Sequence, residues 1–207
     1  MKRPLPNLLV MASLLLAGIA LAAGPASAVE RLAEQAVKGK AIKFHEISFE
    51  LPERGWEYFG DQNAPSIQFI HKYGEHRGQS ITIWTIAIPP SMRGLSPKEH
   101  ASKYFETERH EHYPENWKGF VEGEREIGGK RYPTMKYLVT LPDSKPSPPI
   151  TDGLFLLYFP EDFATRQRFY VLMWQDIHPA DDKGKGLNEF DAIVSSFRVG
   201  PVQGGNK

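Results

Sequence analysis

The alternation of apolar and polar side chains divides most of the chain into short β-strands. Two β-rich runs, residues 66–73 and 79–88, are separated by a short loop that begins and ends with glycine, which is typical of a β-hairpin. In the second run apolar side chains occupy both faces, so we expect a central strand that is covered on both sides.

Further strands are predicted on either side of this hairpin. Residues 42–51 have the alternation of a strand, with a change of phase that indicates a bulge or bend near His45. The pair Gly128-Gly129 separates two more alternating runs and predicts a second hairpin. These two runs are residues 119–126 and 131–141, and two further strands are expected at residues 153–159 and 168–174.

Helical periodicity replaces the strand pattern in a few places. Ser96, Pro97 and Glu99 form a capping box with proline at the first helical position, followed by apolar side chains on one helical face. Residues 187–197 carry apolar side chains at helical spacing and predict a closing helix. A short segment at residues 30–38 predicts a helical turn in a loose N-terminal arm.

The order of these elements predicts the fold class. Consecutive hairpins require an antiparallel sheet, and helices with one apolar face must cover it. We therefore expect an α+β fold, an α/β/α sandwich with a mainly antiparallel sheet covered by helices. It should form one domain over residues 43–199, between an N-terminal arm at residues 29–42 and a flexible C-terminal tail at residues 200–207.

The first 28 residues have the pattern of a secretory signal peptide. Lys2 and Arg3 precede an apolar run at residues 8–23, and Ala26-Ser27-Ala28 supplies the small residues that signal peptidase requires. We expect cleavage before Val29. The protein is then exported, to the periplasm in a Gram-negative bacterium and to the medium otherwise.

Composition excludes several kinds of chemistry and partner. The chain contains no cysteine, which excludes disulfides, thiolate metal sites, cysteine nucleophiles and a lipid-acceptor cysteine. Its 25 basic and 25 acidic side chains are interspersed, so no basic stripe for nucleic acid is present. After Val29 no segment is long and apolar enough for membrane insertion.

One polar cluster near the C-terminus is a candidate metal site. Carboxylate oxygens and an imidazole nitrogen suit a divalent ion, so one hypothesis is a small metal-dependent hydrolase or metal-binding protein. The competing interpretation is a solvated loop, because polar residues are common in turns. The candidate ligands are Asp176, His178, Asp181 and Asp182.

Catalytic motifs are absent from the sequence. There is no G-x-S-x-G, G-x-G-x-x-G, P-loop or H-E-x-x-H pattern, so we expect no enzyme activity and no cofactor. Trp56 and Trp117 lie near expected turns, where exposed aromatic rings serve partner recognition. They are the candidate partner-binding residues.

Five segments occur in an order that resembles a known family. They are ISFELPERGW (47–56), SPKEHASKY (96–104), the Gly128-Gly129 hairpin, RFYVLMW (168–174) and FDAIVSSF (190–197). This order resembles the PsbP-like domains, whose α/β/α sandwich is shared with Mog-type Ran-binding proteins and bacterial DcrB-type periplasmic proteins. The resemblance covers about residues 43–199. It implies a non-catalytic binding or accessory protein with a protein partner in the cell envelope.

Overall fold

The structure is a computed structural model that describes residues 40–51, 55–59, 64–71, 78–112, 117–140, 150–178 and 186–201. The helical turn predicted at residues 30–38 lies outside these ranges. In chain order the elements are β1 (Lys40–Phe44), β2 (Ile47–Leu51), β3 (Trp56–Phe59), β4 (Ser66–His71), β5 (Gln79–Ala87), a 3-10 turn (Pro90–Met92), α1 (Pro97–Thr107), a π-helical turn (Glu108–His112), β6 (Trp117–Ile127), β7 (Lys130–Thr140), β8 (Ile150–Tyr158), α2 (Phe163–Arg166), β9 (Arg168–His178), α3 (Asn188–Ser196) and β10 (Arg198–Val199).

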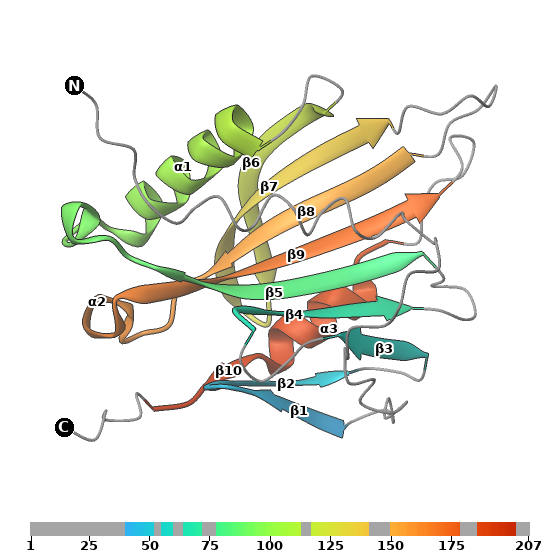
Figure 1. The fold of residues 1–207 in the computed structure, drawn as a ribbon, viewed down its shortest axis with the longest axis horizontal. Coiled ribbons are helices and arrows are strands. Elements are labelled where there is room, and N and C mark those ends of the chain that lie inside the picture. Colours follow the sequence, from blue (N-terminus) through green and yellow to red (C-terminus); the bar gives the residue numbers. More distant parts are fainter. Residues whose placement is uncertain are drawn as a thin grey trace, which may run out of the picture.

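A seven-stranded sheet forms the centre of the molecule (Figure 1). Its strand order is β3-β4-β5-β9-β8-β7-β6, and each neighbouring pair is antiparallel. A second sheet of three strands, β1-β2-β10, is also antiparallel. The predicted α+β class with an antiparallel sheet and covering helices is confirmed.

Apolar side chains cover both faces of the large sheet because its central strands alternate between two cores. In β9, Phe169, Val171 and Met173 join the core under α1. The intervening Tyr170, Leu172 and Trp174 join the core under α3 and the small sheet. This explains why residues 168–174 are almost continuously apolar, as expected for a strand buried on both faces. Helix α3 lies behind the sheet in Figure 1.

Helix α1 begins at the predicted capping box. The Ser96 hydroxyl accepts a hydrogen bond from the Glu99 amide (3.3 Å), and the Ser96 amide donates to the Glu99 carboxylate (2.7 Å). The helix turns His100, Ala101 and Phe105 into the core. Burial lowers the pKa of His100, so its ring is neutral at neutral pH.

The region around His45 differs from the prediction. Residues 42–51 do not form one bulged strand, because the chain reverses at His45-Glu46 and pairs β1 with β2. His45 adopts a φ of 51°, which the left-handed region allows in a tight turn. This reversal creates the small sheet, which extends back to Lys40, within the segment expected to be an arm.

Candidate functional site

Asp176 and His178 are among the last three residues of the strand β9 and do not lie in a solvated loop. Asp176 is fully buried and His178 is 5% exposed. The register of β8 and β9 places Asp152 directly opposite Asp176. The His178 Nε2 atom lies 3.0 Å from Oδ2 of Asp152, so a carboxylate and an imidazole meet at this end of the sheet.

The described part of the chain contains no group of three or more histidine, aspartate and glutamate side chains arranged to hold a metal ion. Asp181 and Asp182 lie outside the described residues. Metal binding at Asp176, His178, Asp181 and Asp182 therefore stays a prediction. Sequence reasoning missed Asp152, because only the pairing of β8 with β9 brings it to His178.

Trp56 is buried, so the expectation that it is exposed for recognition is wrong. Its indole ring is 2% exposed, and its Nε1 donates to Oε2 of Glu189 at the start of α3 (3.0 Å). The ring also meets His71 edge-on. Trp56 therefore ties β3 to α3. Trp117 begins β6, but its side chain lies outside the described residues, and its partner role stays a prediction.

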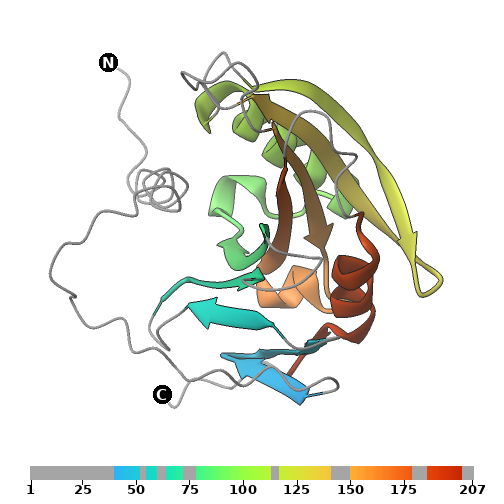
Figure 2. The ribbon, with the colours of Figure 1, turned by 90° about the vertical axis from the view of Figure 1, so that its right-hand side faces the viewer.

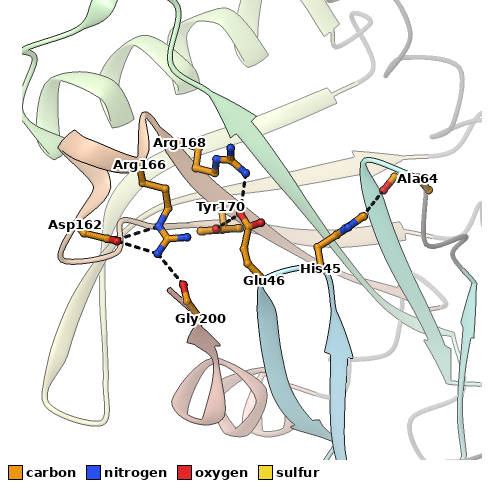
Figure 3. A network of polar contacts seen from close by, with 8 residues as sticks. All are labelled: His45, Glu46, Ala64, Asp162, Arg166, Arg168, Tyr170 and Gly200. Atoms are coloured by element: carbon orange, nitrogen blue, oxygen red, sulfur yellow. Dashed lines mark hydrogen bonds and ion pairs between the residues drawn. The ribbon is translucent and has the colours of Figure 1, made fainter. Parts of the chain in front are cut away.

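Charged side chains gather where the β1–β2 turn meets the start of β9 (Figure 3). Glu46 accepts hydrogen bonds from Nη1 of Arg168 (2.9 Å) and from the Tyr170 hydroxyl (2.6 Å). Arg166 is almost fully buried and donates twice to Asp162 and once to the Gly200 carbonyl. This network joins α2, β9, the β1–β2 turn and the residue after β10.

The network fixes the ionisation of its members. Partial burial opposes ionisation of Glu46, but the hydrogen bonds from Tyr170 and Arg168 outweigh it and lower the pKa of this carboxyl. Burial raises the pKa of Tyr170, and the Glu46 carboxylate raises it further. Each arginine faces a carboxylate, so the network is neutral overall and holds the fold together. The sequence carried no signal for it, because its members are distant in the chain.

A shallow, open groove lies between the small sheet and α3. Its volume is about 440 Å³. Ser48 and Glu50 of β2 line one side, and Ser195 lies on the other side, near Arg198. Across this junction the Glu50 amide donates to the Ser196 hydroxyl (2.9 Å).

The outer strand β6 forms one edge of the large sheet. The β6–β7 hairpin reaches past the neighbouring elements on one side of the molecule (Figure 2). Residues 121–124 are exposed, and Val121 is 61% exposed, a high value for a branched apolar side chain. Arg125 lies on the same face of the strand as Val121, closer to the turn, and donates two hydrogen bonds to Asp191 of α3 (2.7 and 2.5 Å). The hairpin is thus anchored while its outer edge faces solvent.

Comparisons with known proteins show a likeness of fold to a solved structure. No protein-family model matches the chain, and no curated protein matches it. A crystal structure from Bacteroides thetaiotaomicron VPI-5482 is similar with a TM-score of 0.50 and 10% sequence identity, over 80% of this chain and 50% of that chain. The chain therefore spans about half the length of that protein. At this identity the likeness is one of fold.

The solved structures similar to this chain include a PsbP protein, the family that the sequence resembles. It is cyanobacterial PsbP (CyanoP) from Synechocystis sp. PCC 6803, with a TM-score of 0.42 and 15% identity, over 77% of this chain and 91% of that chain. Among the described residues, no helix has the length and apolar character needed to cross a membrane.

Proposed function

We propose that the protein is an exported, non-catalytic accessory protein that acts through contacts with other proteins. The observation that carries this proposal is the exposed edge of β6, a strand of 11 residues. Unpaired strand edges readily accept a strand from another chain, and proteins use them for recognition. The signal pattern of residues 1–28 supports export.

The charged groups of the described core support a binding role rather than a chemical one. The Glu46 network joins four segments, and the pair Arg125–Asp191 joins β6 to α3. These ion pairs stabilise the arrangement of layers from which the β6–β7 hairpin extends. We infer that the scaffold is rigid behind this edge, which favours recognition by a preformed surface.

Export and partner capture test this function together. Intact-mass analysis of the exported fraction should give the mass of residues 29–207, because cleavage is expected after Ala28. Affinity capture after cross-linking in cells should then enrich the same envelope protein in every replicate. An unrelated exported protein with the same tag serves as the control. Retention of Met1 in the membrane fraction, or no enrichment over that control, would contradict the proposal.

A second candidate function is metal binding at the end of β9, with hydrolysis as its chemistry. The observation that favours it is the approach of His178 to Asp152, which adds a carboxylate to the predicted ligands. Imidazole and carboxylate together suit zinc or manganese. This candidate differs from the first because it requires a bound ion.

Native mass spectrometry after incubation with zinc or manganese separates the two candidates. Metal binding predicts one ion per chain in the wild type and its loss in Asp152→Asn and His178→Gln. Asp162→Asn is the matched control, since Asp162 pairs with Arg166 in the separate Glu46 network. An ion-free wild type, or an ion retained equally in all variants, would exclude this site.

A further inference from the structure

The turn between β6 and β7 determines which main-chain groups of β6 face outward. Gly128 and Gly129 both have positive φ and form a two-residue turn that pairs Ile127 with Lys130. The pair that closes such a turn exchanges both main-chain hydrogen bonds, and bonded and non-bonded pairs then alternate along the ladder. Counting back from Ile127, the residues bonded to β7 are Arg125, Gly123 and Val121.

The residues between them direct their N–H and C=O groups to the free edge. These residues are Glu122, Glu124 and Glu126. The strand β6 is the last strand of its sheet among the described elements, so no described strand pairs with these groups. The exposed edge therefore offers three donors and three acceptors at the spacing of a β-ladder.

Pro133 supports this assignment independently. It lies opposite Glu124, in a pair that makes no main-chain hydrogen bonds between β6 and β7. A residue at this position of β7 therefore has no N–H group that β6 needs as a donor. Its nitrogen would instead face β8, and the pairing of β7 with β8 ends at Thr134. Both observations agree with a proline that cannot donate a hydrogen bond.

The side chains of the same three residues make this edge acidic. Glu122 pairs with Arg109 after α1. Among the described residues, the ion pairs of Glu124 and Glu126 are loose contacts with Arg131, at 4.0 and 3.6 Å, and all three of these side chains are more than 60% exposed. Such exposed pairs contribute little and are easily replaced by another cation. A strand added at this edge would meet a row of carboxylates on one face.

We propose that β6 binds an extended segment of a partner protein as an eighth strand, with lysine or arginine at alternating positions facing Glu122, Glu124 and Glu126. This inference rests on the proposed function and names the chemistry of its partner. Main-chain hydrogen bonds provide the affinity, and the alternating charges set which segments bind. A second copy of this chain would bring its own three glutamates, and like charges in a sheet repel.

The probe is an eleven-residue peptide of alternating lysine and valine, compared with one in which glutamate replaces lysine. Titration by NMR should shift the amides of Glu122, Glu124 and Glu126 with the basic peptide and leave them unchanged with the acidic one. Equal binding of both peptides, or no binding of the basic one, would overturn the inference.

Two variants separate the main-chain and charge contributions. Glu124→Pro removes an outward-facing N–H that β7 does not use, so it should weaken peptide binding about tenfold through the lost hydrogen bond while leaving the β6–β7 ladder paired. The variant E122Q/E126Q keeps every main-chain group and should weaken binding and reduce its salt dependence. If Glu124→Pro does not fold, the charge variant still decides. Wild-type affinity in a folded variant of either kind would contradict the inference.

Self-association and partner capture distinguish the remaining outcomes. A dimer in sedimentation that Glu124→Pro dissociates would mean that the edge pairs with a second copy, which overturns the inference. A cellular partner captured equally by wild type and Glu124→Pro would leave the accessory function standing and overturn the docking edge. Binding of the basic peptide without any cellular partner would support the edge and contradict the accessory function.

Discussion

Replacing Gly153 by alanine should destabilise the protein by about 3 kcal/mol, the upper end of the cost of overpacking a core. Gly153 lies in β8 directly opposite Tyr137 of β7, and the Tyr137 ring lies across it. A Cβ atom at Gly153 would overlap Cζ of this ring. Because Tyr137 is buried at 3% exposure, its ring cannot move aside without displacing the core under α1.

Urea unfolding of two glycine variants measures this effect. Gly123→Ala is the matched control, because Gly123 also lies in a strand of the same sheet and its added Cβ would have its nearest neighbour at 3.8 Å. We expect that variant to remain within about 0.5 kcal/mol of wild type. The double variant Tyr137→Leu with Gly153→Ala should cost less than the sum of its parts, since removing the ring removes the clash. Equal losses for the two glycine variants would contradict this packing.

The close approach of Tyr137 to Gly153 also explains a glycine that strand propensity disfavours. Glycine weakens a strand, yet here its missing side chain makes room for an aromatic ring from the neighbouring strand. Burial raises the pKa of Tyr137, so the phenol stays neutral beneath α1. The sequence predicts a strand at residues 153–159, but it does not predict that Gly153 makes room for the Tyr137 ring.

Features with a local cause were predictable from the sequence. The capping box at Ser96 and the Gly128-Gly129 turn depend on residues within a few positions, and the structure has both. The small sheet was missed because its β10 contains only two residues and pairs with β2, about 150 positions earlier in the chain. Its turn at His45 lacks the glycine or asparagine that marks a tight hairpin.

The candidate sites depend on contacts that no local pattern reveals. Proximity to a turn suggested that Trp56 is exposed. It is buried because its side chain lies on the face of β3 that packs against α3. Asp152 reaches His178 only through the register of β8 and β9. The main-chain groups of Glu122, Glu124 and Glu126 face the free edge for two reasons. The position of the Gly128-Gly129 turn is visible in the sequence, but the edge position of β6 is not.

Truncating Ile193 to alanine should destabilise the protein by about 2–5 kcal/mol, through lost burial and the cavity that remains. Ile193 is fully buried on α3, in the core that this helix shares with the large and small sheets. A loss of this size is a large part of the roughly 5–15 kcal/mol that stabilises a typical domain. Helix α3 also carries Glu189 and Asp191, which hold Trp56 and Arg125, so its loosening should reach β3 and β6.

Ser195→Ala on the same helix is the control for Ile193→Ala. Ser195 is exposed, and its hydroxyl donates to the Asp191 carbonyl one turn earlier, so its removal should change stability by about 0.5 kcal/mol or less. Urea unfolding followed by tryptophan fluorescence measures both variants. Hydrogen exchange then locates the effect, because a loosened α3 should release the amides of β6 before those of β9. Similar small losses in both variants would mean that α3 does not close the core.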